Sequence, residues 1–531
     1  MTHDVPRPSA SAHPLLGIRW WPAGLGLGLA MAVVGFIRSQ GDWPYQQRNL
    51  ATMVTLLVAG GWLWLWWLGW SRAPKLWRYW GAGVAAVAVL MGASLFRIRG
   101  VSGDLMPILE PRWARAAPAG TGIAPDPGAA ARKEDVVEAA AGPDFPQFFG
   151  PNRDGVLQGP ALDPDWAARP PQLIWRRPIG AGWSGFAIVG GVAVTQEQED
   201  ESELVTAYER TTGRRLWAHA DLTRYRTTIA GEGPRATPTV VGDRVFTLGA
   251  NGRLNCLTLA EGQLVWARQV TEDAGSEVPE WGYAGSPLYL EGRVIVSGGG
   301  REDRSLLAYD AVTGAVVWAG GSAPAGYSSP VAVELAGVRQ VLSFNSRRIS
   351  AHAPETGVVL WEYPWGAGHP HVALPVVVGT NRVVFSSGYG VGAELLEVRR
   401  ESDGGWAAVR VWRSIRLKAK FANFTARGDF LYGLDDGVLA CVALADGASR
   451  WKEGRYGHGQ MLWVQDLLLL TAEGGEVVLL RPTPEGPGEL HRFKVFGAKT
   501  WNPPALAGDW LVMRNDQEAA ALRLALVTPG P

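Results

Sequence analysis

Three long apolar runs stand near the amino terminus, before any other regular pattern begins. They extend from Trp20 to Ile37, from Ala51 to Trp70 and from Tyr79 to Phe96, and none has a charged residue in its middle. A bilayer core of about 30 Å requires roughly 20 apolar residues in a helix, so each run is about long enough to cross it. The pattern favours three transmembrane helices over buried soluble helices or a cleaved signal peptide.

The residues that flank these runs indicate an orientation. The short loop between the second and third runs carries Arg72, Lys75 and Arg78 and no acidic residue. The positive-inside rule places this loop in the cytoplasm, together with residues 1–19. The part of the chain that follows the third run then lies outside the inner (plasma) membrane, in the periplasm or beyond. Residues 20–96 are therefore the predicted membrane anchor.

The next stretch, residues 97–142, is predicted to be a linker. From Ala114 to Gly142 it is rich in Ala, Pro and Gly and has no apolar periodicity, which is typical of a flexible tether. A short helix is possible around residues 133–141. The segment from Phe145 to Val156 differs, because its aromatic residues and Gly/Pro turns favour an ordered cap packed on the next domain over a binding loop.

A repeat begins beyond this segment. Five copies have a small residue, a glycine six positions later and a tryptophan four positions after that. The small residue ends an apolar strand, the glycine accepts the positive φ of a tight hairpin, and the aromatic residue fills the wedge between neighbouring units. The repeat residues are Gly213, Gly262, Gly314, Gly357 and Gly447, followed by Trp217, Trp266, Trp318, Trp361 and Trp451.

The number of aromatic markers predicts the number of units. Trp412 ends a degenerate copy, and Trp175 and Phe493 fit as the first and last members, which makes eight markers spaced 39 to 52 residues apart. Units of this length with four short strands each predict an all-β, eight-bladed β-propeller over residues 143–531. The last unit lacks a final aromatic strand. Leu173 to Arg177 can supply it and close the ring without leaving free edges.

The charge balance and the cysteine content limit the classes of function that the chain can have. The chain has 531 residues with 50 basic and 50 acidic side chains, so no net field attracts nucleic acid. Its two cysteines, Cys256 and Cys441, occupy the small position of the repeat four blades apart. They are therefore expected to be free, buried thiols rather than a disulfide.

The loops that enter the innermost strands are the candidate site, since by repeat position they converge on one rim of the ring. Two interpretations stay open: a polar and aromatic mouth that holds a small ligand or a peptide, or a solvated rim whose aromatic residues pack between blades. The candidate side chains are Trp183, Arg235, Tyr283, Tyr327, His369, His371, Asn423, His458, Lys499 and Trp501.

Catalytic chemistry is not evident along the chain. His369, His371 and His458 could in principle form a metal site, but histidines alone are a weak signal, and no metal is predicted. No Ser-His-Asp spacing, phosphate-binding glycine loop or dinucleotide fingerprint stands out. We therefore assign no catalytic residue.

The repeat from Ala308 to Trp318 resembles the tryptophan-docking motif of pyrroloquinoline quinone (PQQ)-type propellers. The segment from Phe145 to Val156 is similar to the entry segment of bacterial PQQ-like propeller proteins, and the resemblance extends to about Leu526. This PQQ-like repeat family includes quinoprotein dehydrogenases of alcohols and glucose, and also BamB-like proteins, which have the blades but no cofactor.

The resemblance implies two functions. The first is a non-catalytic, BamB-like binding or scaffolding module without a cofactor, which engages protein or envelope partners through the rim. The alternative is a membrane-bound, PQQ-dependent dehydrogenase of a sugar or an alcohol, using Ca²⁺, with Trp183 or Trp501 stacked on the quinone and Arg235 or Lys499 near its carboxylates. The first is favoured because the vicinal cysteine pair of many such enzymes is missing and their Glu, Asn and Asp set cannot be placed.

Overall fold

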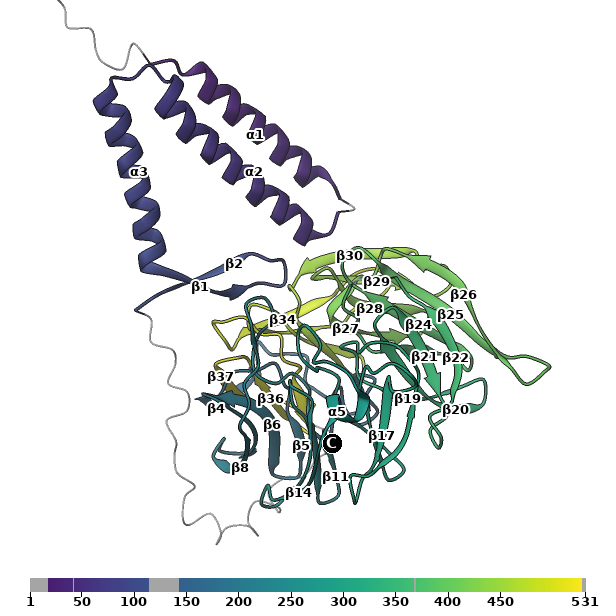
Figure 1. Cartoon of the computed structure of the whole chain (residues 1–531). Coiled ribbons are helices and arrows are strands. Elements are labelled where there is room, and N and C mark those ends of the chain that lie inside the picture. Colours follow the sequence, from purple (N-terminus) through teal and green to yellow (C-terminus); the bar gives the residue numbers. More distant parts are fainter. Residues whose placement is uncertain (1–17, 42, 114–142, 367–368, 528–531) are drawn as a thin grey trace, which may run out of the picture. The chain divides into compact units, whose positions relative to one another are not determined.

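The computed structural model describes residues 18–41, 43–113, 143–366 and 369–527, and Figure 1 shows their helices and strands. The chain divides into two compact units, Met1–Arg115 and Ala116–Pro531. The first contains the apolar helices, and the second contains the sheets.

The amino-terminal unit has three helices that are long and apolar enough to cross a membrane. They are α1 (Trp21–Ser39), α2 (Tyr45–Leu65) and α3 (Lys75–Leu95), and α2 continues into a π-helical turn at Trp66–Trp70. The prediction of three such helices is confirmed.

Tryptophan side chains join these helices at one end of the unit. The indole N–H of Trp62 donates to the Pro22 carbonyl at 3.1 Å, and that of Trp67 donates to the Arg78 carbonyl at 3.1 Å. The ring of Trp66 lies 5.5 Å from that of Trp20. These indoles use backbone acceptors at helix ends, as side chains with an apolar body and one polar atom do at a membrane boundary.

A β-hairpin follows α3 directly, where the sequence predicted the start of a linker. Strand β1 (Phe96–Val101) pairs antiparallel with β2 (Pro107–Pro111). The prediction is wrong here because the alternation of apolar and charged residues is too short to stand out beside the preceding apolar run. Residues 114–142, with the possible helix at 133–141, lie outside the described residues.

The second unit contains eight antiparallel blades of four strands among its described residues, as predicted. Blades 1 to 4 consist of β5 (Ala187–Val189), β6 (Val192–Glu199), β7 (Ser202–Glu209) and β8 (Arg215–Asp221); β11 (Thr239–Val241), β12 (Arg244–Leu248), β13 (Arg253–Thr258) and β14 (Leu264–Gln269); β15 (Leu288–Leu290), β16 (Arg293–Ser297), β17 (Leu306–Asp310) and β18 (Val316–Gly320); and β19 (Val331–Leu335), β20 (Val338–Asn345), β21 (Arg348–His352) and β22 (Val359–Pro364).

The remaining blades complete the ring. Blades 5 to 8 consist of β23 (Val376–Val378), β24 (Arg382–Ser387), β25 (Gly392–Arg400) and β26 (Trp406–Ser414); β27 (Ala419–Arg427), β28 (Phe430–Asp435), β29 (Val438–Ala443) and β30 (Ser449–Arg455); β31 (Gln460–Val464), β32 (Leu467–Thr471), β33 (Glu476–Leu480) and β34 (Glu489–Lys494); and β35 (Ala505–Ala507), β36 (Trp510–Arg514), β37 (Glu518–Arg523) and β4 (Gln172–Pro178). A small hairpin of β9 (Arg226–Thr227) and β10 (Gly231–Glu232) precedes β11, and a short helix, α5 (Val270–Ala274), follows β14.

Closure of the ring is confirmed at blade 8, where β4 from the start of the domain pairs with β37 near its end. Ala521 lies directly opposite Trp175 in this pair, so the closing strand brings its own aromatic marker. Earlier in the chain, β3 (Val156–Leu157) pairs in parallel with β31 of blade 7. Both ends of the domain are thereby built into the ring.

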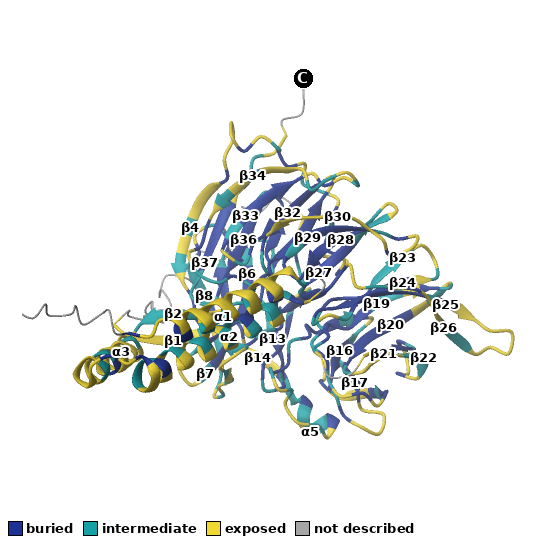
Figure 2. Ribbon diagram, turned by 90° about the horizontal axis from the view of Figure 1, so that it is seen from above, coloured by how far each residue is buried: buried dark blue, intermediate teal, exposed yellow. Residues whose placement is uncertain are grey.

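Burial falls from the axis outward (Figure 2). All five residues of β32 are buried, whereas the outer strand β34 of the same blade is largely exposed. The inner strands therefore form the core, as expected when side chains of both faces pack against neighbouring blades.

The repeat residues form the junctions between blades. The small residue lies directly opposite the tryptophan on the adjacent strand, as Ala207 does opposite Trp217 and Cys256 opposite Trp266. The Trp217 indole N–H then donates to the Leu259 carbonyl of the next blade at 2.9 Å. A Cβ placed on Gly262 would overlap with the Trp217 ring, so the glycine is required for space as well as for its φ of 68°.

The junction at Trp361 departs from this rule. The Trp361 indole donates at 2.8 Å to the Gln340 side-chain oxygen within its own blade. Blade 5 lacks the glycine hairpin because its β25 and β26 are nine residues long and end in a different turn. The insertion noted around residues 401–405 is that turn.

Both cysteines are free and fully buried, as predicted. Cys441 lies opposite Trp451 in the same way that Cys256 lies opposite Trp266. Burial raises the pKa of Cys256 to about 11. These thiols act as small apolar side chains rather than as nucleophiles.

The space below the tryptophan can be tested with two glycine substitutions. Gly262 and Gly292 both have positive φ, 68° and 77°, but nothing lies within 4 Å of a Cβ on Gly292. Gly292→Ala should lower the free energy of unfolding by about 1 kcal/mol through backbone strain alone. Gly262→Ala should lower it by roughly 3 kcal/mol, because the added methyl group also overlaps with the Trp217 ring.

Chemical denaturation of the full chain in detergent, followed by tryptophan fluorescence, gives both values. Equal losses of unfolding free energy for the two variants would show that the close contact between the Trp217 ring and Gly262 does not contribute to stability.

Candidate binding mouth

A ring of hydrogen bonds joins all eight inner strands where they begin. At each junction a polar side chain from a loop that enters an inner strand bonds to the backbone of the neighbouring blade. The bonds are Gly185 N–H to Thr237 Oγ1 (3.1 Å), Thr237 N–H to Ser286 Oγ (2.9 Å), Ser286 N–H to Ser329 Oγ (2.8 Å), Ser328 Oγ–H to the Ala373 carbonyl (3.0 Å), Leu374 N–H to Asn423 Oδ1 (2.8 Å), Gln460 Nε2–H to the Phe421 and Trp501 carbonyls (2.8 and 3.2 Å), and Asn502 Nδ2–H to the Gly182 and Ser184 carbonyls (3.0 and 2.8 Å).

This ring holds the entry loops in place, and the loops form the rim that we call the mouth. It lies at the amino ends of the inner strands. The polar residues that make the ring are buried, and larger side chains lie beside them in the entry loops.

The opposite end of the axis is closed by the entry segment, which confirms the predicted cap. Phe145 exchanges backbone hydrogen bonds with Ile188 of β5, and the Pro146 carbonyl accepts one from Val240 of β11. Arg153 is buried and donates to the Ser286 carbonyl at 3.0 Å and the Pro330 carbonyl at 3.4 Å. Burial lowers the pKa of Arg153 to about 9.

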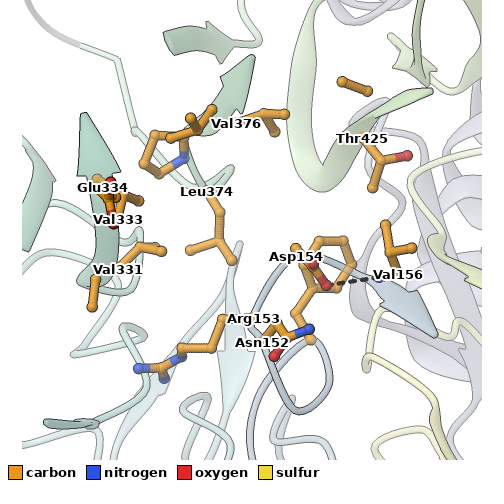
Figure 3. Close-up of a pocket in the computed structure, with 15 residues that line it drawn as sticks. Asn152, Arg153, Asp154, Val156, Val331, Val333, Glu334, Leu374, Val376 and Thr425 are labelled. Atoms are coloured by element: carbon orange, nitrogen blue, oxygen red, sulfur yellow. Dashed lines mark hydrogen bonds between the residues drawn. The ribbon is translucent and has the colours of Figure 1, made fainter. Parts of the chain in front are cut away.

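A cavity of about 310 Å³ lies between this segment and the inner strands of blades 4, 5 and 6 (Figure 3). Its wall is mostly apolar, with Leu374 and Val376 on one side and Val156 on the other. Asp154 faces it and accepts a hydrogen bond from the Val156 N–H at 2.9 Å, and burial raises the pKa of Asp154. The cavity lies toward the carboxyl ends of the inner strands, away from the mouth.

Half of the mouth is a continuous chain of aromatic rings and lysines. The Trp183 and Trp501 rings lie 4.9 Å apart, and the Lys499 ammonium lies 4.7 Å from the first and 3.7 Å from the second. Phe421 extends the chain at 5.1 Å from Trp501. Lys420 lies 5.1 Å from the Phe421 ring and 4.9 Å from that of Tyr389. We call these six residues the aromatic–lysine wall.

Hydrogen bonds fix the orientation of the wall. The Trp183 indole donates to the Ala230 carbonyl at 2.7 Å, and the Trp501 indole donates to Glu473 Oε1 at 3.0 Å. The other oxygen of Glu473 accepts the His458 backbone N–H at 3.0 Å. Trp501, Phe421 and Tyr389 remain partly exposed. The wall thus combines oriented, partly exposed aromatic side chains with positive charge, which together favour anionic groups next to apolar ones.

Other predicted residues form separate pairs around the rim. The Arg235 guanidinium lies 4.5 Å from the Tyr225 ring, and burial lowers the pKa of Arg235 to about 10. The Tyr327 ring stacks on Trp281 at 5.5 Å, and burial raises the pKa of Tyr327 to about 12. His369 stacks on Tyr389 at 5.3 Å.

Three of the predicted side chains do not face the mouth. Tyr283 is buried and donates its hydroxyl to the Gly298 carbonyl, His371 stacks on Phe344, and Asn423 belongs to the ring of hydrogen bonds. His458 is also buried, with its ring edge-on to Phe421. Within the described residues, no group of three or more His, Cys, Asp or Glu side chains is arranged to hold a metal ion.

The sequence missed Lys420, Phe421 and Tyr389. Phe421 stands two residues before Asn423, as Arg235 stands two before Thr237, so alignment on the polar ring residue would have found it. Tyr389 lies in the turn between β24 and β25, which no entry loop predicts.

Glu203 is a buried carboxyl group on the mouth side of blade 1, and it too was missed. It is the second residue of β7, next to the β6–β7 turn. Its carboxyl group accepts a hydrogen bond from the Ala250 N–H of blade 2 at 3.1 Å. Burial raises the pKa of Glu203 to about 7, from an ordinary value of 4.5.

Stability should therefore depend on the protonation of Glu203. Between pH 4.5 and about 7 the unfolded chain loses this proton while the folded chain keeps it, so stability falls as the pH rises and then levels off. Glu203→Gln should remove this component and stabilise the protein above neutral pH by about 3 kcal/mol. The measurement is the difference in unfolding free energy between variant and wild type at several pH values. A constant difference over pH 4 to about 8 would contradict the assignment.

Comparison with known proteins matches residues 201–453 to the family described as outer membrane protein assembly factor BamB. Among curated proteins, the quinohemoprotein alcohol dehydrogenase ADH IIB of Pseudomonas putida is 29% identical over 120 residues. That match spans 22% of this chain and only 17% of the dehydrogenase.

Solved structures share the fold at low identity. A europium-containing methanol dehydrogenase superimposes with a TM-score of 0.53 and 12% identity, over 72% of this chain and 98% of its own. The quinohemoprotein alcohol dehydrogenase of Comamonas testosteroni gives 0.53 and 14%, over 79% and 85%. Residues 201–453 are thus similar to PQQ-like β-propeller proteins, and the part of the chain that follows the three apolar amino-terminal helices has the fold of an eight-bladed β-propeller.

Proposed function

We propose that the protein is a membrane-anchored, non-catalytic binding or scaffolding module of the bacterial cell envelope. The propeller faces the periplasm or the outside of an inner membrane, and its mouth engages protein partners. The observation that carries this proposal is the aromatic–lysine wall, because partly exposed aromatic residues beside cations are the chemistry of protein-binding hot spots.

The chemistry of the wall describes the partner. Lys499 is partly exposed and lies on aromatic rings rather than in open solvent, so a carboxylate that approaches it also meets an apolar surface. A protein segment with acidic residues next to aromatic or aliphatic ones fits this combination. The match to the BamB family supports a binding role, since that family is described as an assembly factor.

The partner-binding role is tested by reversing one charge of the wall. Lys499→Glu should reduce recovery of the partner roughly tenfold, since loss of a hot-spot cation costs more than 1 kcal/mol. Arg382→Glu is the matched control, because Arg382 is exposed and lies at the start of β24, away from the mouth. The measurement is capture of envelope proteins by the solubilised full chain, with quantitative mass spectrometry.

Equal recovery by the wild type, Lys499→Glu and a second wall variant, Trp501→Ala, would contradict binding through the mouth. Equal loss in the Arg382→Glu control would show that the charge of the whole propeller, rather than the wall, selects partners.

The second candidate function is a PQQ-dependent dehydrogenase of a sugar or an alcohol. The short match to a quinohemoprotein alcohol dehydrogenase favours it, and Trp183, Trp501 and Lys499 do lie together. However, the two indoles are tilted by 44° against each other, and Lys499 lies over both rings. A planar quinone would have to displace the lysine, so the residues as arranged do not fit the cofactor.

Calorimetric titration of the full chain in detergent with PQQ and Ca²⁺ separates the two candidates. We expect no saturable heat, because the ring faces are already occupied. Saturable one-site binding that is lost in Trp501→Ala would overturn the scaffold proposal and favour the dehydrogenase.

A further inference from the structure

Four apolar side chains share one face of the hairpin of β1 and β2. Ile98 lies directly opposite Leu109, and Phe96 lies directly opposite Pro111, so these four residues share a face. Trp113 follows on the same side, with its ring 6.1 Å from that of Phe96. This face is not covered by the described part of the chain: Ile98 is 59% exposed, Leu109 62% and Trp113 66%.

The other face carries an ion pair, beside Ile108, which lies opposite Gly100. Arg97 lies opposite Glu110, and their side chains form an ion pair at 2.8 Å. The two faces therefore differ in polarity, and the two-stranded hairpin is amphipathic. Such a hairpin is marginally stable in water by itself and requires a surface for its apolar face.

The hairpin is attached at two points to the ends of the helices. The Arg112 N–H donates to the Leu95 carbonyl at 2.8 Å, next to the end of α3. At the hairpin turn, Asn49 Nδ2 near the start of α2 donates to the Asp104 carbonyl at 3.1 Å. The hairpin thus extends between the ends of two helices, at the end of the bundle opposite the loop that carries Arg72, Lys75 and Arg78.

We propose that the β1–β2 hairpin lies in the membrane interface, with its apolar face at the boundary between lipid headgroups and acyl chains. The proposal rests on the membrane anchoring of the three helices. We assign lipid as the partner of the apolar face because this face continues the exposed apolar surface of α3, where Leu90 is 68% exposed. No residue separates Leu95, the last residue of α3, from Phe96, the first residue of β1. Trp113 and Phe96 stand where interfacial aromatic residues are enriched.

This position has a consequence for the propeller. The connection to the second unit begins at Trp113, so the hairpin holds its start at the lipid surface. Arg97 and Glu110 then face the aqueous side, where their ion pair is solvated. The anchor therefore extends beyond the three helices and ends in an interfacial hairpin.

The depth of the hairpin can be measured on the full chain in nanodiscs of phosphatidylethanolamine and phosphatidylglycerol. Cys256→Ala and Cys441→Ala give a background without thiols, and alanine already occupies the same repeat position at Ala207 and Ala308. Single cysteines introduced by Ile98→Cys and Leu109→Cys carry a fluorescent NBD label. Arg97→Cys is the control on the opposite face, and Leu90→Cys is the control for insertion of α3.

We expect lipids that carry a shallow doxyl group to quench the labels at positions 98 and 109 at least about twofold more than the label at position 97, as for other interfacial apolar faces. Low lipid quenching at 98 and 109, together with strong quenching at 90, would overturn the proposal while the anchor itself stands. If the two labels are then also shielded from aqueous iodide, a protein surface such as the propeller covers the face. No quenching at position 90 would mean that α3 does not enter lipid, which overturns the anchor as well.

Discussion

The contact between a tryptophan and the glycine hairpin of the next blade is the constraint on which the propeller depends. Four-stranded blades expose an outer strand and two faces, so a single blade cannot bury its own apolar residues. The indole fills the outer part of the wedge, bonds to a carbonyl of the next blade, and leaves no room for a Cβ on the glycine. A glycine meets both requirements, because it tolerates positive φ and has no side chain.

The contact between a tryptophan and the next blade recurs around the ring, and two exceptions show which features it requires. Trp361 donates within its own blade, because blade 5 has long outer strands in place of the glycine hairpin. Phe493 marks blade 7 without an indole N–H, and it faces Val477 rather than an alanine. Neither departure opens the ring, since the inner strands are also joined by hydrogen bonds at every junction. Two kinds of contact therefore hold the ring closed: packing of the aromatic markers between outer strands, and hydrogen bonds between the inner strands.

The division between residues that hold the ring and residues that face outward explains what the sequence predicted and what it missed. Blade number, closure by β4 and the buried cysteines follow from the repeat, because five copies share one pattern of small residue, glycine and tryptophan and the eight markers stand 39 to 52 residues apart. The direction in which a loop side chain points cannot be predicted from this spacing. Tyr283 and Trp183 precede inner strands in the same way, yet Tyr283 is turned into the core to reach the Gly298 carbonyl, while Trp183 turns toward Trp501.

Missed residues follow the same logic. Phe421 lies near the start of β27, where no Ser-Pro or Pro-Pro pair marks the entry as it does in several other loops, so the pattern did not select it. Tyr389 and Glu203 reach the mouth from hairpins of the second and third strands, which approach the axis only because the blade is twisted and tilted. The sequence predicts linker at the β1–β2 hairpin because six residues of alternation carry little weight beside a long apolar run. Folding in three dimensions brings these residues to their sites, and their spacing along the chain does not.

The two ends of the propeller axis have different roles, and the route of the chain decides which end is free. The chain enters the ring at the end away from the mouth, where Asp144 accepts the N–H of Gly190 in the β5–β6 turn and Phe145 pairs with β5. Arg153 then fills the axis from the same end. The described entry segment, Phe145 to Val156, therefore lies at the closed end of the axis. Because the entry segment and the mouth lie at opposite ends of the inner strands, a partner can approach the wall without displacing the entry segment.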